Sequence, residues 1–208
     1  MKRALILVDI QNDFLPGGAL AVPEGDAIIP IVNALQPLFD LVIATQDLHP
    51  ADHGSFASNH DGRELYEVVD LNGLDQHLWP DHCVEDSHGA EFSKTLSLAP
   101  DVHIFPKGTD PAIDSYSGFF DNGRRKATGL GDFLARQGVE EVYLTGLATD
   151  FCVKYTALDA VSLGFRTFLI EDATRGVNLK EDDSRIAIEE MKQAGVQVLK
   201  SNELLVSA

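Results

Sequence analysis

Cys152 lies in a stretch whose pattern could make it a nucleophile. An apolar, β-rich run stops at Gly146, and a helix-start signal follows within three residues. Thr149 is a good N-cap residue, and Asp150 suits the positive end of a helix dipole. The same dipole stabilises a thiolate, so a cysteine in the first helical turn is more nucleophilic than one elsewhere.

The turn before Cys152 could also supply an oxyanion hole. The backbone N–H groups of Ala148 and Cys152 could receive a developing negative charge. A strand, a tight turn and a helix that lift a nucleophile off a sheet edge are a known arrangement for acyl transfer. From these residues alone the alternative stays open that Cys152 is a buried structural cysteine on an amphipathic helix.

Asp9 and Lys107 occupy similar places at the ends of predicted strands, residues 4–8 and 102–105. Asp9 could accept the thiol proton of Cys152 and later pass it to a leaving amine. Lys107 could keep Asp9 ionised and favour the thiolate. Taken singly, the aspartate could cap a turn and the lysine could be a surface residue. Because ligands bind beyond the carboxyl ends of parallel strands, we expect these groups to lie together.

A second group of residues has the spacing of metal ligands. Asp47 and His49 stand two apart in an extended segment and point the same way, and His53 lies one loop turn away. Imidazole and carboxylate ligands suit Zn, Fe(II) or Mn(II). Cys83 is interpreted as a buried, inert thiol, and solvated loop histidines are the alternative to a metal site. Spacing leaves the remaining ligand open among four residues: His60, His77, His82 and His88.

Apolar runs and helical periods alternate along the chain. The predicted strands are residues 4–8, 41–45, 102–105, 142–145, 165–170 and 196–199, and the predicted helices are residues 26–39, 130–137, 149–163 and 182–194. This alternation predicts an α/β fold: one domain over residues 1–208, with a doubly wound, mostly parallel six-stranded sheet and helices on both faces. Residues 46–101 are largely irregular, apart from a short strand predicted near residues 67–71 and one helical turn near residues 91–95. Metal ligation would explain so long a loop region.

Composition excludes several classes of partner. The 208 residues include 16 Lys and Arg against 33 Asp and Glu, a formal charge of −17, which would repel nucleic acid and anionic membranes. No run approaches the ~18–20 apolar residues that span a bilayer. Two cysteines without a signal sequence indicate a reduced, cytoplasmic protein. We therefore expect a small-molecule partner and a monomer or small homo-oligomer.

Six motifs, in order along the chain, resemble those of the nicotinamidases, which belong to the isochorismatase-like cysteine hydrolases. The Asp, Lys and Cys motifs are shared across that superfamily, and the Asp-x-His-x3-His and Trp-Pro-x-His-Cys motifs narrow the resemblance to nicotinamidases. The matching motifs are VDIQNDF at 8–14, DLHPADH at 47–53, WPDHC at 79–83, KG at 107–108, YSGF at 116–119 and GLATDFCV at 146–153.

The resemblance implies a role for each matching position. It implies a catalytic triad of Asp9, Lys107 and Cys152, and an oxyanion hole from the N–H groups of Ala148 and Cys152 beside a cis peptide between Leu147 and Ala148. It implies one divalent metal ion (Zn, Fe or Mn) whose ligands, completed by waters, are Asp47, His49, His53 and His82. It also implies a pyridine pocket walled by Phe14, Trp79 and Tyr116.

The reaction implied by the resemblance is hydrolysis of nicotinamide to nicotinate and ammonia through a cysteine thioester, a step of NAD salvage. Pyrazinamide is an expected second substrate. Residue Phe151, where relatives differ, leaves the fine specificity open. Two alternatives remain at this stage: another cysteine amidase of the superfamily with a carbamoyl or ureido substrate, and a metal-hydroxide hydrolase in which Cys152 is structural.

Overall fold

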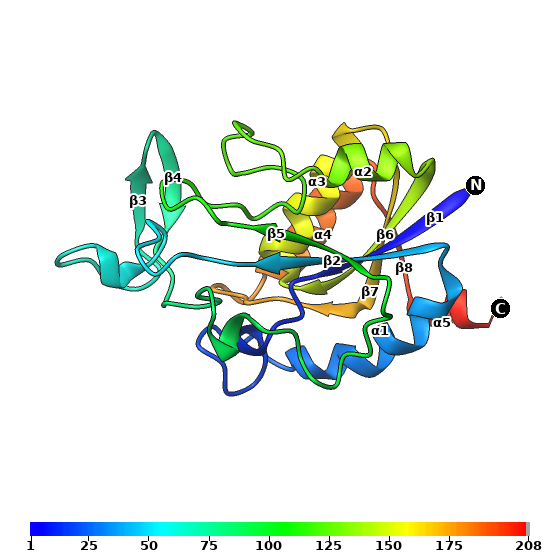
Figure 1. The fold of residues 1–208 in the computed structure, drawn as a ribbon, viewed down its shortest axis with the longest axis horizontal. Helices are drawn as coiled ribbons and strands as arrows, with labels where there is room; N and C mark the ends of the chain where they lie inside the picture. The colour runs from blue at the N-terminus through cyan, green and yellow to red at the C-terminus, as the bar shows by residue number, and fades with distance from the viewer. Residues whose placement is uncertain (207–208) are drawn as a thin grey trace.

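A six-stranded parallel sheet forms the centre of the molecule. The computed structural model describes residues 1–206 and orders the strands β5-β2-β1-β6-β7-β8, each pair of neighbours running parallel (Figure 1). The strands are β1 (Lys2–Val8), β2 (Leu41–Asp47), β5 (His103–Lys107), β6 (Val139–Leu147), β7 (Arg166–Arg175) and β8 (Gln197–Leu199). The predicted fold class is therefore confirmed.

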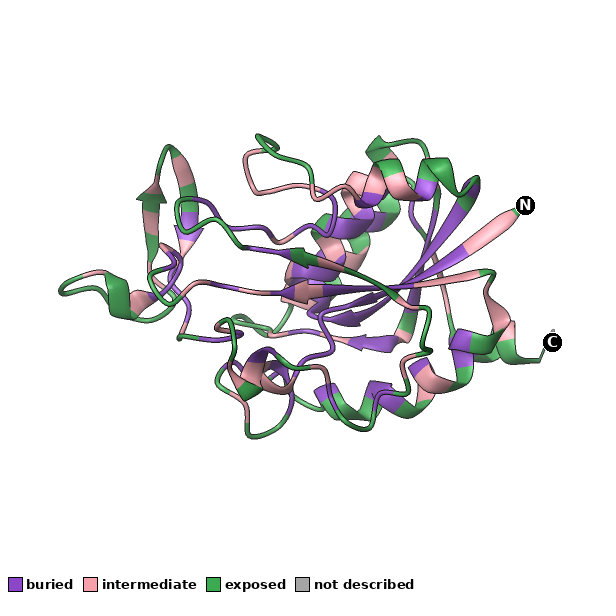
Figure 2. Ribbon diagram, viewed as in Figure 1, coloured by how far each residue is buried: buried purple, intermediate pink, exposed green. Residues whose placement is uncertain are grey.

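Helices cover both faces of the sheet because buried side chains alternate along each central strand. In β1, Leu5 and Leu7 belong to the core that α1 and α5 cover, and Ile6 and Val8 belong to the core that α2, α3 and α4 cover (Figures 1 and 2). The helices are α1 (Ile29–Leu35), α2 (Leu130–Arg136), α3 (Lys154–Ser162), α4 (Asp183–Ala194) and α5 (Ser201–Leu205). In the described part of the chain, residues 1–206, no helix is long and apolar enough to cross a membrane.

The loop region between β2 and β5 contains a two-stranded hairpin, of which the sequence predicted only the first strand. Strands β3 (Val68–Leu71) and β4 (Leu74–His77) form an antiparallel hairpin at the end of the molecule where β2 and β5 terminate (Figure 1). Asn72 and Gly73 both have positive φ, 53° and 86°, as a two-residue hairpin turn requires. Most of the hairpin is exposed or half-buried, unlike the central strands (Figure 2).

The segment leading into α3 differs from the predicted helix of residues 149–163. A π-helical turn over Thr149–Val153 precedes α3, and Ala148, not Thr149, is its N-cap residue. The Thr149 hydroxyl instead donates to the Thr174 hydroxyl at 2.9 Å. The prediction of Thr149 as the N-cap is therefore wrong, because its side chain ties the turn to β7 rather than to the helix backbone.

Candidate active site

Three strand ends bring Asp9, Lys107 and Cys152 together. Asp9 directly follows β1, Lys107 ends β5, and Cys152 lies in the π-helical turn after β6. The Lys107 Nζ lies 2.9 Å from Asp9 Oδ2 and 3.4 Å from Cys152 Sγ. The three residues are 0%, 2% and 7% exposed, respectively. Their meeting follows from the parallel register, which aligns Val8 with Gly146.

Lys107 is positioned by the edge strand β5, which continues beyond the apolar run predicted as a strand over residues 102–105. Pro106 lies within β5, where a missing N–H is tolerated because β5 is the edge of the sheet. The extension pairs Lys107 with Asp47 at the end of β2, and Lys107 Nζ is 2.5 Å from Asp47 Oδ1. The backbone turns immediately afterwards at Gly108, where φ is +66° and a Cβ atom would meet the His49 ring.

Lys107 contacts both carboxylates of this cluster, Asp9 and Asp47. Burial works to lower the pKa of Lys107, but Asp47 and Asp9 outweigh it and raise the pKa well above its usual value. Burial likewise works to raise the pKa of Asp47, yet Lys107 and His49 hold that pKa well below its usual value. Lys107 therefore remains an ammonium and Asp47 a carboxylate.

Burial of the Cys152 thiol opposes the thiolate stabilisation expected from the helix dipole and from Lys107. Burial raises the pKa of the Cys152 thiol well above its usual value, and the neighbouring Lys107 only partly offsets this. Asp9, whose own pKa is raised chiefly by burial, adds a negative charge that also disfavours the thiolate. A thiol whose pKa is raised needs a nearby base when it attacks, which is the role predicted for Asp9.

The candidate oxyanion donors lie on the same cavity as the thiol. Ala148 and Cys152 both line it, and the peptide bond between Leu147 and Ala148 is cis, as the resemblance implies. The Ala148 carbonyl accepts the N–H groups of Phe151 and Val153, both at 3.1 Å. The side chain of Asp150 is not one of the candidate oxyanion donors. It accepts the backbone N–H groups of Val177 and Asn178 and so holds the loop after β7 in place.

Asp47, His49 and His82 form a buried group beside the cysteine. One ligand atom of each lies within 4.8 Å of the others, and Asp47 Oδ2 is 3.5 Å from His49 Nε2 and 3.7 Å from His82 Nε2. The Nδ1 atoms of His49 and His82 each lie 2.8 Å from a backbone carbonyl, those of Gly108 and Pro80. A carbonyl only accepts, so Nδ1 carries the hydrogen and Nε2 keeps a lone pair for an ion.

His53 stands slightly apart from this group. One ligand atom of His53 lies within 4.8 Å of one ligand atom each of His49 and Asp114. These three residues form a second buried set. Among the described residues, the buried Nε2 atoms of His49 and His53 have no hydrogen-bond partner. Orphaned imidazole nitrogens beside a carboxylate fit a divalent Zn, Fe or Mn ion. The donor set thus fits the ion, and Asp114 is a member that the sequence reasoning missed.

The other candidate histidines lie elsewhere in the described residues. His60 contacts the Gly54 carbonyl at 2.7 Å, His88 pairs with Glu91 at 3.0 Å on the surface, and His77 stacks on Trp79 with ring centroids 5.7 Å apart. Cys83 is fully buried and free, and burial raises its pKa well above its usual value.

A narrow aromatic cavity of about 30 Å³ joins the thiol to the ligand cluster. The predicted walls Phe14, Trp79 and Tyr116 all line it, together with Asp47, His82 and Cys152. The Trp79 indole donates to the Tyr116 hydroxyl at 3.2 Å, which fixes both rings. Sequence reasoning missed three other lining residues, Leu20, Asp114 and Val177, because none has a motif of its own.

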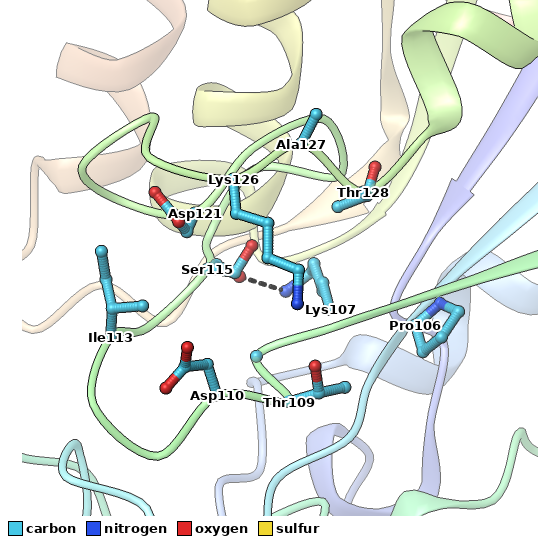
Figure 3. A pocket seen from close by; sticks show the side chains of 11 residues that line it. Pro106, Lys107, Thr109, Asp110, Ile113, Ser115, Asp121, Lys126, Ala127 and Thr128 are labelled. Carbon is cyan, nitrogen blue, oxygen red and sulfur yellow. Dashed lines mark hydrogen bonds between the residues drawn. The ribbon is translucent and has the colours of Figure 1, made fainter.

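A larger cavity of about 200 Å³ is lined by Lys107, by the loop after β5 and by residues 126–128 (Figure 3). Lys107 Nζ donates to the Ser115 carbonyl there at 2.8 Å. The cavity contains neither Cys152 nor the histidine cluster among its lining residues. The aromatic cavity is therefore the one that joins the candidate nucleophile to the candidate ion ligands.

Fold and site together define a parallel α/β protein with a buried Asp-Lys-Cys cluster at the carboxyl edge of its sheet. The isochorismatase domain model matches residues 3–203, and the chain belongs to this family.

Relatives and solved structures agree over nearly the full length. The chain is 52% identical over 197 residues to the nicotinamidase of Escherichia coli, covering 93% of this chain and 92% of that protein. A structure titled as an Acinetobacter baumanii nicotinamidase and pyrazinamidase superposes with a TM-score of 0.95 at 45% identity, covering 98% of each chain. A Pyrococcus horikoshii pyrazinamidase in complex with zinc has a TM-score of 0.80 at 40% identity, covering 96% of this chain and 99% of that one.

Proposed function

We propose that this protein is a nicotinamidase, which hydrolyses nicotinamide to nicotinate and ammonia through a thioester on Cys152. The observation that supports it most is an aromatic cavity that touches both the Cys152 cluster and the Asp47–His82 ligand cluster. A nucleophile at one side and an ion site at the other suit a flat ring that carries both a nitrogen and an amide. Homology to nicotinamidases over nearly the full chain points to the same substrate.

In the first half of the reaction Asp9 acts as a base. Asp9 takes the Cys152 proton as the sulfur attacks the amide carbon, and the N–H groups of Ala148 and Cys152 hold the oxyanion. Asp9 then gives the proton to the amide nitrogen, the C–N bond breaks and ammonia leaves. The ammonium of Lys107 stays charged throughout and holds Asp9 in place at 2.9 Å.

In the second half, water replaces ammonia. Asp9 accepts a proton from the water as its oxygen attacks the thioester carbon. The C–S bond breaks, Asp9 returns its proton to the Cys152 sulfur, and the product loses the second proton of the water to solvent and leaves as nicotinate. Each proton taken by Asp9 is therefore given back, so the cycle consumes one amide and one water.

A divalent ion bound at the ligand cluster would supply a Lewis acid for the ring nitrogen of the substrate. Asp47, His49 and His82 would hold it, with His53 beside them. Phe14, Trp79 and Tyr116 would wall the ring. Such orientation can contribute at most ~7–11 kcal/mol to lowering the barrier. This arrangement predicts that benzamide, which lacks the ring nitrogen, is a much poorer substrate than nicotinamide.

Ammonia release before and after chelation tests the proposal. We expect turnover of nicotinamide by the metal-loaded protein, a loss on the order of 100-fold after a chelator removes the ion, and recovery on adding Zn, Mn or Fe(II). Metal analysis of the same samples gives the occupancy, and benzamide serves as the control substrate. No ammonia from nicotinamide with any of the three metals would overturn the proposal.

A pH profile tests Asp9 as the base. The Thr45 hydroxyl donates to Asp9 Oδ1 at 2.6 Å and so lowers the pKa of Asp9. Burial raises the same pKa. The other titratable groups that act on Asp9 are Lys107, Asp47 and Cys152. The base must be ionised, so kcat/KM rises with pH through that pKa. Thr45→Val removes the hydrogen bond, raises the pKa further and should move the acid limb to higher pH.

The control for this profile is Thr167→Val, a buried threonine on β7 whose hydroxyl donates to the Phe165 carbonyl at 3.0 Å. Its acid limb should match that of the unmodified enzyme. An acid limb for Thr45→Val that stays in place or moves to lower pH would rule out Asp9 as the titrating base.

We further propose that the enzyme acts in the cytoplasm on a free small molecule, without a nucleic-acid partner, as a monomer or small homo-oligomer. The net charge of −17 and the two free cysteines, Cys83 and Cys152, support this.

A further inference from the structure

Asp114 is a buried carboxylate that the proposed mechanism does not use. It is 3% exposed and lies on the loop after β5, outside the predicted metal-binding region of residues 46–101. One of its oxygens, one ring nitrogen of His49 and one ring nitrogen of His53 all lie within 4.8 Å of one another. Asp114 therefore reaches the histidine cluster from a segment distant in sequence.

One ring nitrogen of each histidine near Asp114 has no hydrogen-bond partner. Within residues 1–206, nothing hydrogen-bonds to the buried His49 Nε2 and His53 Nε2, and both residues are 0% exposed. A buried polar atom left unsatisfied costs ~1–3 kcal/mol. The second nitrogen of His53 is fixed by the Ser55 hydroxyl at 2.7 Å, so rotation of the ring is restrained. These atoms thus form a prepared site for a positively charged or water-carrying ligand.

Asp114 has acceptor capacity to spare for such a ligand. Its Oδ1 accepts the Ser115 N–H at 2.7 Å, and its Oδ2 accepts the Gln76 side chain at 3.0 Å. Each carboxylate oxygen has two lone pairs, so both retain one. The two hydrogen bonds hold the carboxylate in its orientation and leave one lone pair on each oxygen for a further ligand.

The formal charges of the buried cluster also leave room for a divalent ion. The three carboxylates Asp9, Asp47 and Asp114 carry −3, and Lys107 carries +1, so the sum is −2. A buried net charge of this size is costly unless it is compensated. An ion of charge +2 balances the cluster, and without Asp114 the same ion would leave an excess positive charge.

We propose that Asp114 is a residue of the ion site, where with His53 it forms a second face across His49 from Asp47 and His82, and that its charge sets the affinity for the divalent ion. The inference rests on the ion site of the proposed function. A purely structural role, in which Asp114 only holds the Ser115 turn and Gln76, would leave the ion affinity unchanged.

Competition with a chromophoric chelator measures the ion affinity without any substrate. Asp114→Asn keeps the shape and an acceptor for Ser115 but removes the charge. We expect its Kd for Zn²⁺ and for Mn²⁺ to rise by about 10- to 100-fold, the range found when residues around metal ligands are changed. The visible absorption of the Co²⁺-loaded protein should shift as well, because the surroundings of His49 and His53 change.

Asp75→Asn is the matched control, since it removes the same charge from an exposed residue of β4 that adjoins Gln76. Its Kd should stay within twofold of the unmodified protein. If Asp114→Asn does not fold, Asp114→Ser keeps an acceptor for the Ser115 N–H and is expected to show the same loss of affinity.

The outcomes separate this inference from the proposed function. Tight Zn²⁺ binding by the unmodified protein together with an unchanged Kd in the folded Asp114 variant would overturn the role of Asp114 alone. If the unmodified protein binds none of these ions, the ion site of the proposed function fails and the role of Asp114 fails with it.

Discussion

Cys152→Ala is expected to abolish ammonia release from nicotinamide, by at least about 10⁴-fold, while the bound ion stays in place. The sulfur is the only nucleophile that the mechanism uses, and Ala leaves Asp9 without a thiol proton to accept. The ion ligands belong to β2 and the loops after it, so the metal content should match the unmodified protein. Turnover is measured as ammonia release, and occupancy by metal analysis.

Residual turnover in this variant would distinguish the remaining alternative. A substantial rate in metal-loaded Cys152→Ala would indicate a water activated by the ion as the nucleophile, with a structural role for the cysteine. Alkylation by iodoacetamide gives an independent control. Protection of the unmodified enzyme by nicotinamide is expected if the thiol lines the substrate cavity, and insensitivity to alkylation would contradict the thiol mechanism.

Lys107→Met is expected to destabilise the protein by about 3–5 kcal/mol and to reduce turnover severely. The substitution leaves the buried carboxylates of Asp9 and Asp47 without the ammonium that now lies 2.9 Å from one and 2.5 Å from the other. It also raises the pKa of Asp9, because Lys107 at present lowers it, so less of the base is ionised. Denaturant unfolding and ammonia release measure the two effects.

Two comparisons show whether the buried charges cause this loss. Lys154→Met breaks a surface ion pair with Glu190, 3.1 Å away, and should cost no more than about 1 kcal/mol. Adding Asp9→Asn to Lys107→Met removes one of the uncompensated charges and should restore part of the stability but not the activity. A Lys107→Met protein as stable as the unmodified one would contradict the charge argument.

The motif residues illustrate what the sequence predicts well. Asp9, Asp47 and Lys107 follow or end short apolar runs, and parallel strands place such positions at one edge of a sheet. The six strands themselves are detectable because each carries a continuous apolar run or a turn signal at its end. Among the elements outside the sheet, the Asn72-Gly73 pair was a usable hairpin signal for β3 and β4, although the predictions include only a strand near residues 67–71.

The missed positions are those that depend on contacts between distant segments. Leu20, Asp114 and Val177 reach the cavity from loops that have no periodicity and no motif, so nothing local marks them. The extension of β5 through Pro106 depends on β5 being the edge strand, which only the order of the strands determines. The N-cap prediction for Thr149 is wrong because the Thr149 hydroxyl donates its hydrogen bond to the hydroxyl of Thr174, 25 residues away.

The sequence by itself therefore determined the fold class, the six strands and the chemical groups at their ends, because apolar periodicity and strand termini are local properties. Only the tertiary structure decided the direction in which the pKa of Cys152 shifts and the place of Asp114. Burial raises the pKa of the thiol despite the helix and Lys107, and burial is a property of the whole fold. Asp114 meets His49 and His53 across 65 and 61 residues of chain, a distance over which no local pattern carries information.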